Sequence, residues 1–123
     1  MIELAFGILC VAGLIGLALA LLYLRGPGAP PPHSAIPAVH GGIGATSLAV
    51  LLVALARGGP RRSMGTAGFG RTAAGLLVLA LALGLAIAMV SRRRRRPAGA
   101  LVGAHAGLAI AGLVVLWALI ALG

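Results

Sequence analysis

The chain has 123 residues, of which 61% are hydrophobic, and its ten arginines, single acidic residue and absence of lysine give a formal charge of +9. This composition excludes a water-soluble globular domain, because too few polar residues are present to cover its surface. The single cysteine, Cys10, excludes an internal disulfide and a cysteine-rich metal site, and the absence of lysine excludes a retinal-type Schiff base.

Four segments without charged side chains predict four membrane-spanning helices. Each holds about 20 residues or more, the length that crosses a hydrocarbon layer of roughly 30 Å. We therefore predict an all-α integral membrane four-helix bundle that forms a single transmembrane domain, with both termini on the same side. The predicted spans are residues 4–24, 36–56, 72–91 and 98–122, and the loops are 25–35, 57–71 and 92–97.

The segment boundaries follow from local chemistry in chain order. The first span begins after Met1-Ile2-Glu3, which lacks the basic character of a signal peptide, and Arg25 closes it. A proline-rich connector follows, which prevents helix formation. Pro37 then suits the first turn of the second span. The third span ends in five consecutive arginines, favoured at a helix C-terminus by the helix dipole.

The arginines lie at the ends of the spans, and aromatic side chains for base stacking are nearly absent, so we expect no nucleic-acid partner. We expect anionic lipid headgroups and other membrane subunits as partners. Loops 1 and 3 hold six arginines and loop 2 holds four, which favours loops 1 and 3 as the cytoplasmic side. We expect a bacterial inner-membrane protein, with a dual or partner-imposed orientation left open.

Two histidines occupy matching positions in the second and fourth spans. His40 and His105 are 65 positions apart, and both lie within about two turns of the start of their spans, on the same membrane face. Further matches at this offset suggest a repeated helical hairpin, although spans 1 and 3 match only as generic apolar runs. Since an imidazole in a bilayer gives up its hydrogen bonds to water, the pair marks a candidate functional site.

Two imidazoles at equal depth on neighbouring helices suit the axial ligands of a haem iron in a four-helix bundle. The sequence therefore predicts one haem b held by His40 and His105 between spans 2 and 4. Small residues near the ligands would let a flat ring approach the backbone, and arginines on the same face would hold its propionates or lipid headgroups. The glycines are Gly41, Gly42, Gly44, Gly103 and Gly107, and the arginines are Arg25, Arg92, Arg93 and Arg94.

Other interpretations of the same residues remain open. Glycines at these spacings also serve ordinary helix packing in lipid, and a histidine near the interface can bond a carbonyl or a headgroup. The histidines also suit proton or substrate handling. His33 and Met89 are alternative ligands, although solvation and core packing are the simpler expectations for them.

With His40-Gly41-Gly42 and His105-Ala106-Gly107 on alternate spans, the chain resembles, at class level, four-helix membrane cytochromes b and haem-bearing anchor subunits. The resemblance implies electron transfer between a catalytic partner and quinone. A non-catalytic subunit of a larger membrane complex is the alternative, and a small proton-coupled transporter is the second. Small multidrug transporters depend on a glutamate inside span 1, whereas the only acid here is Glu3. No nucleophile with its base and no carboxylate pair supports hydrolysis, and whether the chain is an enzyme stays open.

Overall fold

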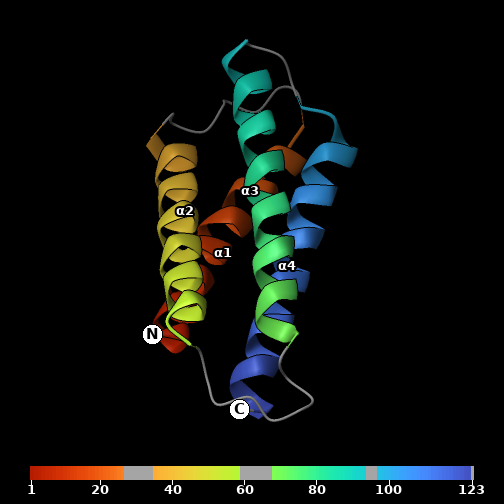
Figure 1. The fold of residues 1–123 in the computed structure, drawn as a ribbon. Coiled ribbons are helices and arrows are strands. Elements are labelled where there is room, and N and C mark those ends of the chain that lie inside the picture. The colour runs from red at the N-terminus through yellow and green to blue at the C-terminus, as the bar shows by residue number, and fades with distance from the viewer. Residues whose placement is uncertain (27–34, 59–67, 94–96, 123) are drawn as a thin grey trace.

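A computed structural model describes residues 1–26, 35–58, 68–93 and 97–122. These residues form four long α-helices that lie alongside one another in a bundle (Figure 1). The fold is all-α, as the sequence predicts, and the described residues contain no strand. The helices are α1 (Ile2–Leu24), α2 (Ala35–Ala56), α3 (Phe69–Arg92) and α4 (Gly99–Leu122).

The predicted spans agree with the helices to within three residues at every boundary. The larger differences arise because the predicted spans stop at charged residues, whereas α1 includes Glu3 and α3 includes Arg71 and Arg92. Glu3 lies in the first turn of α1, where the helix dipole favours an acidic side chain. Arg71 lies in the first turn of α3 and is exposed, so its long side chain can extend toward the headgroups. Helices α1 and α2 are each followed by a glycine with positive φ, Gly26 at +93° and Gly58 at +96°.

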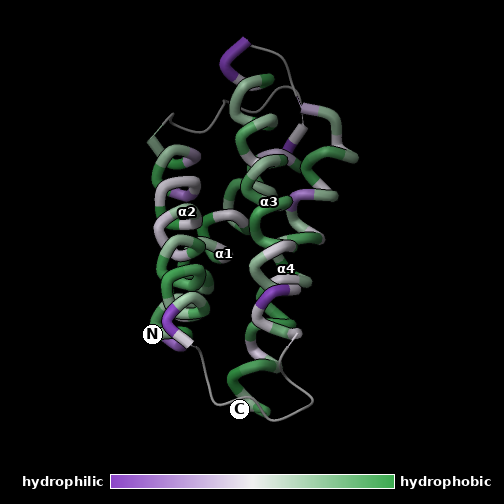
Figure 2. The backbone as a smooth tube through the Cα atoms, viewed as in Figure 1, coloured by the Kyte–Doolittle hydropathy of each residue, from purple (hydrophilic) through white to green (hydrophobic). Residues whose placement is uncertain are grey.

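All four helices are long and apolar enough to cross a membrane, and the chain is an integral membrane protein. Each has 22 to 24 residues, which corresponds to about 33–36 Å of helix and matches the hydrocarbon thickness. Figure 2 shows the hydrophobic colour along most of each helix, with strongly hydrophilic segments mainly near the helix ends. Both chain termini lie at the same end of the bundle (Figure 1).

The bundle consists of two antiparallel hairpins, α1–α2 and α3–α4, which have the most extensive helix–helix contacts. The pairs α2–α3 and α1–α4 close the ring, and no backbone packing crosses either diagonal among the described residues. If α1 is exchanged with α3 and α2 with α4, the α1–α2 contact becomes the α3–α4 contact and the α2–α3 contact becomes the α1–α4 contact. The arrangement is therefore a two-fold pseudo-symmetric repeat around the bundle axis, in which the hairpins share one orientation.

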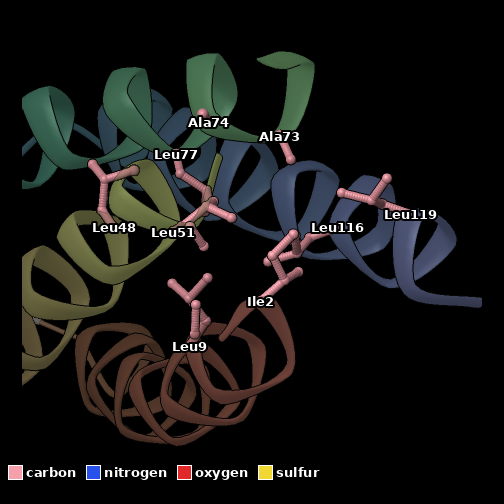
Figure 3. Close-up of a cluster of buried hydrophobic side chains, with 11 residues drawn as sticks. Ile2, Leu9, Leu48, Leu51, Ala73, Ala74, Leu77, Leu116 and Leu119 are labelled. Atoms are coloured by element: carbon pink, nitrogen blue, oxygen red, sulfur yellow. The ribbon is translucent and has the colours of Figure 1, made fainter. Parts of the chain in front are cut away.

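The apolar core lies in the half of the bundle that contains both chain termini, which we call the terminal half. Figure 3 shows the side chains of Leu51, Leu77 and Leu116 turned toward one another from three helices, with Leu9 and Ile2 of α1 nearby. Leu51 and Leu116 are completely buried. The remaining members of the cluster are Ala5, Leu48, Ala54, Ala73, Ala74 and Leu119.

The other half of the bundle, which we call the histidine half, comprises residues 13–26, 35–46, 81–93 and 97–111. None of these residues is buried, whereas every buried residue of the described chain lies in the terminal half. Close side-chain packing therefore stabilises one end of the bundle, and the other end is more open.

This asymmetry predicts the effect of truncating leucines. Leu51→Ala removes a fully buried side chain from the centre of the terminal half, and we expect it to lower the free energy of unfolding by about 2 kcal/mol or more. Leu17→Ala, in the histidine half, removes a side chain that is 57% exposed and should change it by less than about 0.5 kcal/mol. The measurement is SDS-induced unfolding in mixed micelles followed by circular dichroism. Equal losses in the two variants would contradict the location of the core.

Candidate functional site

His40 lies in the second turn of α2 and contacts the facing helix of its own hairpin. Its Nδ1 is 2.9 Å from the carbonyl oxygen of Ala12 on α1. The imidazole lies directly over Gly16, one turn further along α1, where an added Cβ would be 2.8 Å from the ring Cε1. The side chain is partly buried. A carbonyl group of α1 and the bare backbone of a glycine thus hold His40.

His105 is held in the same way in the second hairpin. Its Nδ1 is 2.7 Å from the carbonyl oxygen of Ala80 on α3. The ring lies over Gly84, where an added Cβ would be 3.1 Å from Cε1. In each hairpin the carbonyl comes from the alanine of an Ala-x-x-x-Gly motif on the first helix, and the histidine comes from the second helix. We call Ala12 with Gly16, and Ala80 with Gly84, the two histidine seats.

The two seats belong to a repeat that extends along α1 and α3 at an offset of 68 positions. Ala5, Leu9 and Ala12 are buried on α1, and their counterparts on α3, Ala73, Leu77 and Ala80, are also buried. The repeat predicted from α2 and α4 therefore has a specific counterpart in α1 and α3, at a different offset.

Corresponding contacts in the terminal half support the same repeat. Ser47 of α2 donates a hydrogen bond of 2.6 Å from Oγ to the carbonyl oxygen of Ala5. Its counterpart on α4 is Gly112, where an added Cβ would be 3.5 Å from the carbonyl oxygen of Ala73. In each hairpin the second helix thus approaches the equivalent carbonyl of the first helix, in one case with a hydroxyl and in the other with a bare backbone.

The two imidazoles meet between α2 and α4, across a diagonal of the bundle. Their ring centroids are 6.0 Å apart, and the ring planes make an angle of 81°. This contact brings together the two residues that the sequence identifies as a pair, and it lies between the hairpins rather than within one of them.

The hydrogen bonds define the protonation of each neutral ring. A carbonyl oxygen only accepts, so each Nδ1 must carry the proton and donate it. In the neutral form, each Nε2 then keeps its lone pair. Neither Nε2 has a hydrogen-bond partner among the described residues. This is the tautomer in which a histidine binds a metal through Nε2 while a backbone carbonyl orients the ring.

The five glycines predicted to line the site are not in close helix packing. A Cβ added to Gly41, Gly42 or Gly44 of α2 would have nothing within 4 Å, and the same holds for Gly103 and Gly107 of α4. Within the single chain, this finding disfavours helix packing as their role. Sequence reasoning missed Gly16 and Gly84 as contacts of the histidines. An alignment of the first and third spans at their own offset would have pointed to both.

Three of the four arginines predicted to serve the site, Arg25, Arg92 and Arg93, lie at the histidine end of the bundle. Arg25 follows α1 and Arg93 follows α3, and each is nine residues beyond the glycine of its seat, so they are counterparts in the repeat. Arg92 is the last residue of α3, and all three are exposed. The predicted residue Arg94 and the alternative ligand His33 lie outside the described residues.

A polar contact links the two hairpins at this end. The hydroxyl of Tyr23, near the end of α1, donates a hydrogen bond of 2.9 Å to the carbonyl oxygen of Pro97, just before α4. Met89, the other alternative ligand, is 62% exposed. In the described part of the chain, no group of three or more His, Cys, Asp or Glu residues is arranged to hold a metal ion. The candidate site is therefore the histidine pair itself.

Comparison of the chain with protein-family models, with curated proteins and with solved structures finds no match in any of the three.

The histidine contact predicts that positions 40 and 105 can be cross-linked. In a Cys10→Ala background, we expect His40→Cys with His105→Cys to react with a short bis-maleimide in high yield, because the two native ring centroids are only 6.0 Å apart across the diagonal. Val39→Cys with His105→Cys is the matched control, since Val39 is 51% exposed on α2. Mass spectrometry of the protein after cleavage between the hairpins measures the product. Equal yields from both pairs would contradict the central position of His40.

Proposed function

We propose that this protein is a small membrane cytochrome of the b type, in which His40 and His105 are the two axial ligands of one haem and electrons pass to or from a membrane partner. The observation that carries the proposal is the histidine pair itself. Two imidazoles from different hairpins lie next to each other between α2 and α4, and each is bound through Nδ1 to a backbone carbonyl, so both Nε2 atoms are left for a ligand.

The spacing of the rings is compatible with one metal between them. A metal–imidazole nitrogen bond is about 2.0–2.1 Å and a ring centroid lies roughly 1 Å behind its nitrogen, so two imidazoles on opposite sides of one metal have centroids about 6 Å apart. The observed separation is 6.0 Å. The angle of 81° between the rings is also compatible, because ligation by two imidazoles would require no particular angle between the ring planes.

The number of protein ligands favours a macrocycle over a bare ion. Two imidazoles leave most coordination positions of a simple metal ion unfilled, and no third His, Cys, Asp or Glu joins them in the described part of the chain. A porphyrin supplies four nitrogen ligands of its own and needs only two axial ligands from the protein.

The surroundings of the pair also suit a flat, largely apolar group. No described residue of the histidine half is buried, and the glycines next to both histidines have open space where a side chain would be. The exposed Arg25, Arg92 and Arg93 at this end would pair with propionates, or with anionic lipid headgroups.

When bound, haem would supply one-electron redox chemistry, and the chain would hold it and set its surroundings. Since both histidines lie near one end of the bundle, a single group there does not carry electrons across the whole membrane. We therefore propose that electrons continue to quinone or to a cofactor in a partner subunit. We also propose a bacterial inner membrane, with the histidine end on the cytoplasmic side because its two loops carry six of the ten arginines.

The test is the visible spectrum of protein purified in mild detergent from haem-replete cells. We expect a reduced-minus-oxidised difference spectrum typical of six-coordinate haem b. His40→Ala and His105→Ala should each abolish this signal, because removing either ligand leaves five-coordinate or unbound haem. His33→Ala, which removes the third histidine of the chain, is the control and should retain it.

A folded wild-type protein without haem would refute the proposal. If deletion of this protein then destabilised a larger membrane complex, the protein would be an accessory subunit of that complex. Proton-coupled substrate flux in liposomes would instead indicate a transporter. If only His33→Ala lost the signal, His33 would be an axial ligand in place of His40 or His105, and the proposed ligand pair would be wrong.

A further inference from the structure

Four glycines of the described helices stand out by how closely another side chain approaches them, and they form two classes. At Gly70 and Gly112, in the terminal half, the nearest side chains to an added Cβ are leucines. At Gly16 and Gly84, in the histidine half, all three nearest atoms belong to the imidazole of His40 or His105. The second class therefore faces the candidate site rather than the apolar core.

The close approach is forced by the hydrogen bonds. An added Cβ at Gly16 would lie 2.8 Å from Cε1 of His40, a distance at which one of the two groups must shift. The ring cannot simply swing away, because its Nδ1, next to Cε1, is bound to the carbonyl of Ala12. At Gly84 the corresponding distance is 3.1 Å, so a smaller displacement of His105 suffices.

Each glycine also leaves room for the imidazole beside the carbonyl that the histidine uses. In an α-helix the carbonyl of residue i points toward residue i+4 and already accepts its N–H. Ala12 and Ala80 precede Gly16 and Gly84 by four residues, so the side chain absent from each glycine would flank the carbonyl in question. A second donor from the neighbouring helix can then reach the oxygen.

We infer that Gly16 and Gly84 are positioning residues, which fix the orientation and the Nδ1–H tautomer of His40 and His105 and so leave both Nε2 atoms to bind one shared metal. The shared metal rests on the proposed function, whereas the positioning of the rings does not. The hairpin repeat supplies one such glycine to each histidine, so the site is built from two equivalent halves.

The same two helices carry glycines that serve as controls for Gly16 and Gly84. Gly7 and Gly75 occupy equivalent positions nine residues earlier on the same helices, and an added Cβ there meets nothing within 4 Å. They provide matched controls, since an alanine at any of the four positions has the higher helix propensity. Only the substitutions at Gly16 and Gly84 create a contact with an imidazole.

The experiment compares Gly16→Ala and Gly84→Ala with Gly7→Ala and Gly75→Ala in full-length protein. The first measurement is made without haem, by ¹⁵N NMR of histidine-labelled protein in bicelles. In the wild type we expect both intramembrane histidines as the Nδ1–H tautomer. Gly16→Ala should convert the His40 signal largely to another tautomer or to an exchanging mixture, and Gly84→Ala should affect the His105 signal less.

The second measurement is the retention of haem during titration with an apo-haem acceptor protein. Loss of a group that orients a metal ligand typically weakens binding about 10- to 100-fold. We expect Gly16→Ala to retain haem at least about tenfold less tightly, Gly84→Ala to show a smaller loss, and both controls to match the wild type.

The two measurements separate the two ideas. If the wild type binds no haem, the proposed function fails, but the tautomer shifts alone still test the positioning role. If both Gly16→Ala and Gly84→Ala gave the NMR signals of the wild type, the inference would be wrong, even if the wild-type protein proved to bind haem in the spectroscopic test. Shifts of equal size in the control variants would overturn it as well. If Gly16→Ala does not fold, as judged by circular dichroism, the milder Gly84→Ala decides the question.

Discussion

An imidazole inside a bilayer must find its hydrogen-bond partners within the protein, and the central arrangement of this chain depends on how two histidines do so. Each donates from Nδ1 to a backbone carbonyl of the preceding helix. A carbonyl that already accepts its helical hydrogen bond can accept a second one only where the surface of that helix lets the donor approach. Gly16 and Gly84 leave room for the imidazoles beside these carbonyls, and each bond in turn fixes the rotation of its ring.

The position of the candidate site follows from the presence of this interaction in both hairpins. Each hairpin carries one seat and one histidine, and the two hairpins are related by a two-fold pseudo-symmetry around the bundle axis. A group that projects toward the axis from one hairpin therefore meets its counterpart from the other. The contact between the two rings, with centroids 6.0 Å apart, follows from the symmetry. Arg25 and Arg93, which follow α1 and α3, are counterparts in the same repeat.

The two halves of the bundle contribute differently to stability and to the candidate site. The terminal half contains all the buried residues of the described chain, among them Leu51 and Leu116. Since in lipid helices associate through close packing rather than through the hydrophobic effect, this half holds the bundle together. The histidine half contributes little close packing and instead carries polar groups that need partners. The packed half therefore holds the helices in register, while the residues of the histidine half stay exposed or partly buried.

Most of the fold could be predicted from the sequence, since charged residues interrupt the apolar segments near the positions where the helices begin and end. The histidine pair was also predictable, because polarity in an apolar span and equal depth from one membrane face are visible in the residues alone. The glycines were harder to assign. Gly41 and Gly42 are neighbours of His40 in sequence, but successive residues of a helix point about 100° apart, and nothing lies close to either glycine. The residue that touches the ring, Gly16, is on another helix.

The repeat in α1 and α3 escaped detection for a related reason. Gly16 precedes His40 by 24 positions, whereas Gly84 precedes His105 by 21, because the connection between the second pair of helices is shorter. A comparison of the chain with itself at one fixed offset therefore aligns α2 with α4 but moves α1 out of register with α3 by almost one helical turn. In that register the seat residues Ala12 and Gly16 match unrelated apolar positions. The contacts across each hairpin restore the alignment, since Nδ1 of each histidine identifies the equivalent carbonyl whatever the length of the connection.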